Sequence, residues 1–238
     1  MLKLIVFDWD GTLANSVGKI IECKHFLAEK YNIPSPSEEV IKSVLGKKFE
    51  DAMSICFPTI PQNILTTLGR EFHVLMQQDY FQASLFPNVK NVLRLLKEQG
   101  IKCAIATSKD RKELDRAIMY NQIIDMFDIA CCGKEHQEKP DPAMLNYIMK
   151  KLYVRPNESM MIGDTTTDIL FATNTGVQSI GVTFGAHPIS LLQSLNPLAL
   201  IDEWLELPKI IDKYYATQIE YIVDYSRGLD EWILCNPS

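Results

Sequence analysis

Near its N-terminus the chain reads Leu4-Ile5-Val6-Phe7-Asp8-Trp9-Asp10-Gly11-Thr12-Leu13, a short apolar run followed at once by two aspartates and a glycine. Such a run, bounded by polar residues, is typical of a buried strand. Ligands of open parallel sheets bind at the carboxyl ends of the strands, so Asp8 is expected at the mouth of a crevice. Asp8 and Asp10 can serve as nucleophile and proton carrier, while Gly11 can bring its backbone amide close to an anion. The other interpretation is an Asp-Gly turn after an edge strand.

Further apolar runs of the same kind recur along the chain, and helical patterns lie between most of them. The expected strands are residues 4–7, 103–106, 129–131, 160–162 and 179–182. Uniformly apolar strands that alternate with helices indicate a parallel sheet covered on both faces. The sequence therefore predicts an α/β fold, a Rossmann-like parallel sheet with helices on both faces, plus an inserted all-helical cap domain.

The insertion is predicted because residues 15–86 show helical periodicity and no convincing strand. About seventy residues is far more than a normal connection between two strands, so this segment is expected to form a helical cap. Pro34-Ser35-Pro36 and 58–61 are its expected turns. The α/β core would then comprise 1–14 and 87–205. Residues 206–238 would form a helical extension of one helix or two, with these residues on or near one face: Ile210, Ile211, Tyr214, Ile219 and Ile222.

Charge and cysteine content limit the possible partners. Residues 202–238 contain eight acids and three bases, so they carry −5 of the formal charge of −6 and leave the rest nearly neutral. A chain without a basic stripe is not expected to bind nucleic acid, and an acidic tail disfavours anionic membranes. The six cysteines form no CxxC pair, no apolar run reaches membrane-spanning length, and no signal peptide is evident. Reduced thiols and a cytoplasmic location are therefore expected.

Three more motifs are expected at the ends of strands. Gly163-Asp164-Thr165-Thr166-Thr167-Asp168 places two carboxylates one helical turn apart, an arrangement suited to Mg²⁺, although Asp164 or Thr165 could simply cap a helix. Thr107-Ser108-Lys109 can form a phosphate cradle or merely an N-cap. In Lys139-Pro140-Asp141-Pro142 the lysine precedes a proline, so Lys139 could hold its ammonium against carboxylates and a phosphate or lie at the surface.

Taken in order, these four motifs resemble the haloacid dehalogenase-like hydrolase superfamily, in its phosphoglycolate-phosphatase-like branch with an inserted helical cap. The resemblance covers about residues 1–205. It implies that Asp8 is the nucleophile that forms an aspartyl-phosphate and Asp10 the general acid/base. It further implies that Thr107 and Lys139 hold the phosphate and that Asp164, supported by Asp168, binds Mg²⁺ together with Asp8 and Asp10. The loop Phe184-Gly185-Ala186-His187-Pro188 resembles the one after the fifth strand in this branch.

The resemblance implies a Mg²⁺-dependent phosphatase that acts on a small phosphorylated metabolite, with Gly11 and Ser108 among the substrate-binding residues. Dehalogenases and phosphonatases of the superfamily lack the second aspartate, so Asp10 points to phosphoryl transfer. Lys47 and Lys48 in the cap, where relatives often carry apolar residues or proline, are expected either to bind a charged leaving group or to be a solvated surface pair. A phosphosugar mutase, an inorganic pyrophosphatase and a non-catalytic binding module are the alternatives. A monomer or weak homodimer is expected.

Overall fold

A computed structural model describes residues 1–215, 222–223 and 232–233. Its main sheet has six strands, all parallel, in the order β3-β2-β1-β4-β5-β6. Their bounds are β1 Leu4–Phe7, β2 Lys102–Ala106, β3 Ile129–Cys131, β4 Ser159–Gly163, β5 Gln178–Val182 and β6 Ala199–Ile201. The α/β fold with a parallel sheet is confirmed. The chain runs outward from β1 to β3 and then restarts at β4 on the other side of β1, so the order of strands reverses beside β1.

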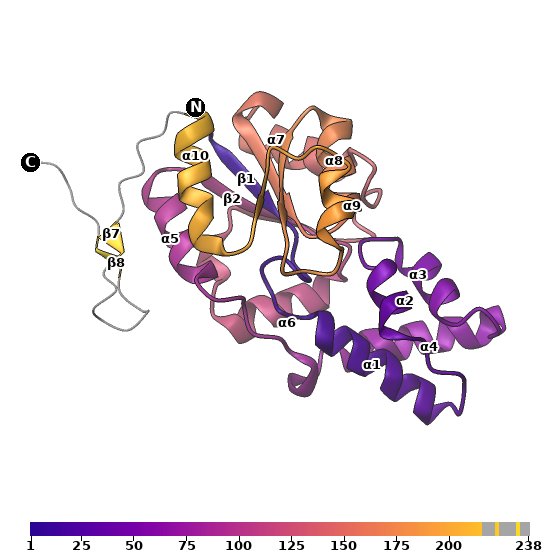
Figure 1. The fold of residues 1–238 in the computed structure, drawn as a ribbon. Coiled ribbons are helices and arrows are strands. Elements are labelled where there is room, and N and C mark those ends of the chain that lie inside the picture. Colours follow the sequence, from indigo (N-terminus) through magenta and orange to yellow (C-terminus); the bar gives the residue numbers. More distant parts are fainter. Residues whose placement is uncertain (216–221, 224–231, 234–238) are drawn as a thin grey trace, which may run out of the picture.

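Helices cover both faces of this sheet, as the uniformly apolar strands predict. Alternate residues of β1 point to opposite sides: Ile5 and Phe7 belong to one buried cluster with α5 (Val89–Glu98), α6 (Arg111–Asn121) and α10 (Leu207–Tyr215). Leu4 and Val6 belong to a second cluster with α7 (Ala143–Leu152) and α8 (Thr166–Thr175). The short helix α9 (Ile189–Gln193) lies beside α8 (Figure 1). Apolar burial on both faces stabilises the sheet.

Between β1 and β2 the chain forms α1 (Val17–Lys30), α2 (Glu38–Ser43), α3 (Phe49–Cys56), α4 (Gln62–Leu75) and the 3₁₀ turn η1 (Asp79–Phe81). Figure 1 shows α1–α4 gathered in a group of their own beside the sheet, at the lower right. These helices bury a separate hydrophobic cluster of their own. The two chain crossings into and out of this group lie together, because Asn15 N donates to Ser84 O and Phe86 N donates to Leu13 O, both at 2.9 Å.

Two expectations from the sequence fail at the C-terminal side. Strand β6 was not among the predicted strands; its three residues follow Pro197 closely, and they pair only with β5 at the edge of the sheet. The predicted helix after Leu207 is α10, with Ile211 buried, but Ile222 lies in β7 (Ile222–Val223), which pairs antiparallel with β8 (Trp232–Ile233). A second helix through Ile222 is therefore wrong, and Ile219 lies outside the described residues. The remaining short 3₁₀ turns are η2 Ile124–Met126, η3 Pro156–Glu158 and η4 Trp204–Glu206.

Five of the six cysteines are described, and all five are buried with free thiols: Cys23, Cys56, Cys103, Cys131 and Cys132. Burial raises their pKa values, to about 12 for Cys103, so these thiols stay protonated. Cys235 lies outside the described residues. Within the described part of the chain, no helix combines the length and the apolar character needed to cross a bilayer.

Candidate active site

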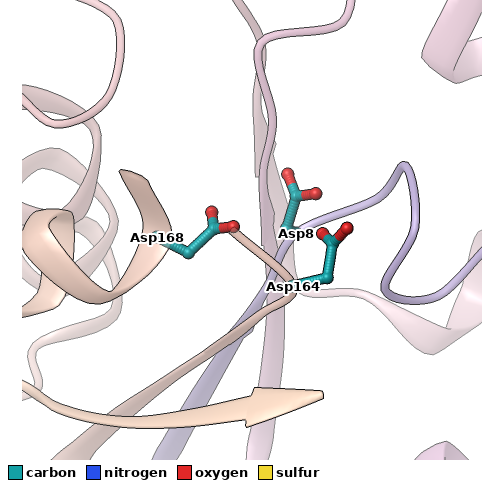
Figure 2. A group of neighbouring side chains, drawn as sticks. All are labelled: Asp8, Asp164 and Asp168. Carbon is teal, nitrogen blue, oxygen red and sulfur yellow. The ribbon is translucent and has the colours of Figure 1, made fainter. Parts of the chain in front are cut away.

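Three carboxylates meet where the order of strands reverses (Figure 2). Asp8 follows β1, Asp164 follows β4, and Asp168 lies in the first turn of α8. One carboxylate oxygen from each lies within 4.8 Å of the others, and all three residues are buried. Strand pairing places the first two together, because Phe7 is in register with Ile162 and the Asp8 amide continues the ladder by donating to Ile162 O at 2.9 Å.

Asp164 is the most tightly enclosed of the three. Its Oδ1 accepts a hydrogen bond from Thr12 Oγ1 at 3.0 Å, and its Oδ2 accepts one from Ala186 N at 2.7 Å. A Cβ atom on Gly11 would lie 2.3 Å from Asp164 Oδ2, and one on Gly185 would lie 2.1 Å from Asp164 Cβ. Only glycine leaves room for this carboxylate, and Gly11 also has a positive φ of 79°.

The role expected for Gly11 needs correction in one respect. Its amide donates to Ala14 O at 2.9 Å and is therefore already paired, rather than free for an anion. The glycine acts sterically, because the tight turn after β1 would otherwise clash with Asp164.

Lys139 bridges two of the three acids from the loop before α7. Its Nζ donates to Asp8 Oδ1 at 2.8 Å and to Asp168 Oδ1 at 2.7 Å, although the two partners are 131 and 29 residues away in the chain. The other oxygen of Asp168 accepts from Thr165 N and Thr165 Oγ1, the N-cap of α8. Capping by Thr165 and clustering of acids, which were rival interpretations of this motif, are thus both present.

One lysine does not neutralise three buried acids. Burial raises the pKa of Asp8 to about 7, against the opposing effect of Lys139 and with added repulsion from Asp168. Burial, followed by repulsion from Asp8 and Asp168, raises the pKa of Asp164 well above its usual range. Burial by itself would lower the pKa of Lys139, but Asp168 and Asp8 outweigh it and raise that pKa. The site therefore holds an excess of negative charge that a further cation would relieve.

The chemistry of this donor set fits a hard divalent cation. Three closely spaced carboxylates offer the oxygen ligands that Mg²⁺ prefers, and when all three are ionised they and the Lys139 ammonium carry a net charge of −2. Asp8, Asp164 and Asp168 would hold the ion. The Asp10 carboxylate, also expected at the metal, is not one of this group, and its Oδ2 pairs with Lys109 Nζ at 3.1 Å.

A second series of contacts between charged side chains connects Asp10 to the inserted helices. Lys109 lies 3.1 Å from Asp10 and 3.6 Å from Glu113, one turn along α6, and His73 Nδ1 of α4 lies 2.6 Å from Glu113 Oε1. Burial would lower the pKa of Lys109, but the two carboxylates raise it, so this lysine stays charged. Asp10 is thus held by Lys109, which Glu113 also holds, and Glu113 in turn contacts His73 of the inserted helices. The Oδ1 atom of Asp10 is buried without a hydrogen-bond partner in the described part of the chain.

A cavity of about 100 Å³ lies between the carboxyl ends of the strands and helices α1–α4. Asp8, Asp10, Lys139 and Asp168 line one side together with Thr107 and Ser108, which follow β2. Asp164 lies beneath them and does not line the cavity. Thr107 Oγ1 accepts from Lys109 N at 3.2 Å, which leaves the hydroxyl proton free to donate toward the cavity.

The two lysines expected in substrate binding lie at different places in the structure. Lys47 lines the cavity, whereas Lys48 lies in an outer depression with Glu138. Gly46 precedes them with a positive φ of 82°, and a Cβ there would lie 2.6 Å from Thr165 Oγ1. This close approach of Gly46 to Thr165 brings the start of the loop near the acids, so Lys47 lines the cavity and Lys48 does not.

Sequence reasoning missed three charged or titratable residues that line this cavity: Lys24, His73 and Glu113. Lys109 was part of the Thr107-Ser108-Lys109 motif, but its charge was given no role. Two of the three missed residues had a detectable signal. Glu113 follows Lys109 by four residues, one helical turn. Lys24 follows Ile20 by four and precedes Leu27 by three, so it interrupts the apolar face of its helix. His73 had no such signal, because its partner lies on a distant segment.

Comparisons with a family model and with known proteins indicate the same family. The family model described as haloacid dehalogenase-like hydrolase matches residues 5–182. A protein of Vibrio parahaemolyticus named phosphoglycolate phosphatase is 30% identical over 221 residues, which cover 88% of this chain and 96% of that protein. A Clostridium perfringens protein named "Putative pyrophosphatase PpaX" is 29% identical over 218 residues, which cover 90% and 99%.

Solved structures agree with the fold. The crystal structure of a predicted phosphoglycolate phosphatase from Haemophilus somnus has a TM-score of 0.78 and 26% identity, over 88% of this chain and 97% of that one. The resemblance that the four sequence motifs indicate is thereby confirmed.

Proposed function

The chain belongs to the haloacid dehalogenase-like hydrolase family, and on that premise we propose that it is a Mg²⁺-dependent phosphatase that hydrolyses a small phosphorylated metabolite through an aspartyl-phosphate. One observation carries the proposal: Asp8 and Asp10, two residues apart, line one cavity with different partners. Asp8 belongs to the acid group with Lys139, and Asp10 pairs with Lys109. Two carboxylates in different surroundings can take different roles in one reaction.

In the first step, a carboxylate oxygen of Asp8 attacks phosphorus, and the bond between phosphorus and the leaving oxygen breaks. Asp10 gives its proton to that oxygen, so the product leaves as an alcohol. Thr107 donates its hydroxyl proton to a phosphate oxygen, and the Lys139 ammonium balances the added negative charge. The acid step is assigned to Asp10 because its buried Oδ1 has no protein partner in the described residues.

In the second step, Asp10 accepts a proton from water, and the resulting hydroxide attacks the phosphorus of the aspartyl-phosphate. The bond between phosphorus and Asp8 breaks, inorganic phosphate leaves, and both carboxylates return to their starting states. Asp8, Asp164 and Asp168 would hold a Mg²⁺ ion, which would supply positive charge that offsets the repulsion between the attacking carboxylate and the phosphate.

We assign the core to residues 1–14 and 87–205, the cap to 15–86 and an extension to 206–238. Adjacent crossings at Asn15 and Phe86 support these boundaries. The cap supplies the other side of the cavity and so would exclude water and select the leaving group. Lys47 lines the cavity and is the better candidate of the lysine pair for this role, and Ser108 lines the same cavity from the core side. The five buried free thiols support a cytoplasmic enzyme.

A second candidate function is inorganic pyrophosphatase, because one of the relatives carries that name. The phosphosugar mutase remains an alternative with the same acids, and the size of the cavity favours a small substrate in every case. A panel of phosphorylated metabolites, incubated with the purified protein and Mg²⁺, distinguishes them by release of inorganic phosphate. A phosphatase releases one phosphate per ester, a pyrophosphatase releases two from pyrophosphate, and a mutase releases little. Absence of phosphate release from every compound would contradict the proposed function.

A further inference from the structure

The cavity has two chemically different sides. The side formed by the core is polar and charged. The side formed by the cap is largely apolar, with Ile20, Val44, Leu45, Phe49, Ala52 and Phe72. Two lysines of the cap line the same cavity: Lys47 is exposed, whereas Lys24 of α1 is buried among these apolar residues.

Lys24 is buried in unusual surroundings. The residue is only 3% exposed. Its Nζ lies 3.4 Å from Met53 Sδ and 5.4 Å from the centroid of the Phe72 ring. No carboxylate of residues 1–215 forms an ion pair with it, whereas the two other buried lysines of the cavity, Lys109 and Lys139, have two carboxylates each.

A thioether and an aromatic ring are weak partners for an ammonium group. Burial lowers the pKa of Lys24, and it outweighs the opposing effects of the Cys56 thiol, which forms a side-chain hydrogen bond with Lys24, and of Cys23. A buried charge without a counterion destabilises a fold, and an apolar residue of similar length would fill the same space at lower cost. The lysine is therefore an unfavourable choice for packing, and an anion in the cavity would supply the partner that the protein does not.

We propose that Lys24 is a specificity-determining residue that binds a negatively charged group on the leaving portion of the substrate. The inference rests on the proposed function and deepens it. A phosphoryl group at Asp8 and Thr107, on the core side, directs the rest of a small substrate toward the cap, where Lys24 lies. The preferred leaving group carries a carboxylate or a second phosphate, because both are anions that accept charge-assisted hydrogen bonds from an ammonium.

The test compares matched substrates on the wild type, Lys24→Met and Lys30→Met. Methionine keeps the length of the side chain and removes its charge. Lys30 lies on the same helix, is half exposed and pairs with Glu71, so it is the control. The anionic substrates are 2-phosphoglycolate and pyrophosphate, and 2-hydroxyethyl phosphate is the neutral match of the first. The readout is the ratio of kcat/KM for the anionic substrate to kcat/KM for the neutral one.

We expect Lys24→Met to lower this ratio by about ten- to a hundredfold, the scale of one charge-assisted hydrogen bond, and Lys30→Met to leave it unchanged. A fall for 2-phosphoglycolate alone identifies a carboxylate, and a fall for pyrophosphate identifies a phosphate. The melting temperature of Lys24→Met should equal or exceed that of the wild type, because an unpaired buried charge is gone. An unchanged ratio, or equal losses on all substrates with a lower melting temperature, would overturn the proposal and make Lys24 a structural residue.

A binding measurement separates this proposal from the proposed function. Calorimetric titration with glycolate, and with ethylene glycol as its neutral match, needs no turnover. We expect glycolate to bind the wild type and Lys30→Met more tightly than Lys24→Met by about tenfold or more. If no substrate releases phosphate but this difference persists, the proposed function is wrong and the anion site stands. If phosphate is released and the difference is absent, the proposal for Lys24 is wrong.

Discussion

Replacing Asp8 by asparagine should abolish turnover and at the same time stabilise the metal-free fold above neutral pH. The amide cannot attack phosphorus, so loss of the covalent step should cost several kcal/mol of barrier, with tenfold in rate for each 1.36 kcal/mol. The substitution is nearly isosteric, and the asparagine oxygen can still accept the hydrogen bond from Lys139, which also keeps its 2.7 Å contact with Asp168. The fold should therefore persist.

The sign of the stability effect follows from the raised pKa of Asp8, which is about 7 in the fold against an ordinary 3.8. Between these values the folded protein binds a proton that the unfolded chain has released, so the stability of the fold falls as pH rises. At pH 8 the full difference of about three units corresponds to about 4 kcal/mol, of which about 2 to 3 kcal/mol is lost between pH 5 and pH 8. Asp8→Asn removes this loss, which for a chain of this size corresponds to a melting temperature higher by on the order of 10 °C at pH 8.

Thermal unfolding followed by circular dichroism in excess chelator, at pH 5 and pH 8, measures the effect. The difference between the wild type and Asp8→Asn isolates this one carboxyl group from other titrating groups. Asp125→Asn is the control, because Asp125 is exposed and outside the cavity. If the wild type and Asp8→Asn lost stability in parallel between the two pH values, burial of Asp8 would not be the cause. Retention of a tenth of wild-type activity by Asp8→Asn would refute the aspartyl-phosphate mechanism.

Three further predictions follow from the site and its surroundings. Activity should require Mg²⁺ and be inhibited by Ca²⁺, which prefers more oxygen ligands at longer distances and would draw in both oxygens of the nucleophile; full turnover in excess chelator would contradict this. Lys47→Ala should lower kcat/KM for substrates with a charged leaving group by about tenfold, and Lys48→Ala should not, because only Lys47 lines the cavity; equal effects in steady-state assays would reject the distinction. The five buried cysteines should react with a thiol reagent only after unfolding, and intact mass spectrometry of the unreduced protein should reveal no disulfide among them.

The sequence determines the sheet and the acids that directly follow its strands. Apolar runs such as Leu4–Phe7 are local patterns, and a strand that is buried on both faces must be apolar throughout. Asp8 and Asp164 could be placed at one edge of the sheet because every strand of a parallel sheet ends at the same side. The insertion of helices between β1 and β2 is also a local property, since the continuous apolar run of β1 gives way to apolar residues that recur with the helical period of 3.6.

Contacts between residues that are far apart in the sequence were determined only by the tertiary structure. Lys139 and Asp8 are 131 residues apart, and the sequence gives a reason for a lysine there but no means of identifying both of its acids. Gly11 looked like an amide donor, yet the space that it leaves is taken by Asp164, a residue from another strand. Lys24 interrupts the apolar face of α1 in the sequence, but only the packing of α1 beside Met53 of α3 and Phe72 of α4 encloses its charge. Local periodicity determines which face of a helix or strand is apolar. Which faces pack together depends on contacts between segments that are distant in the sequence. The same contacts determine which charges surround each buried group.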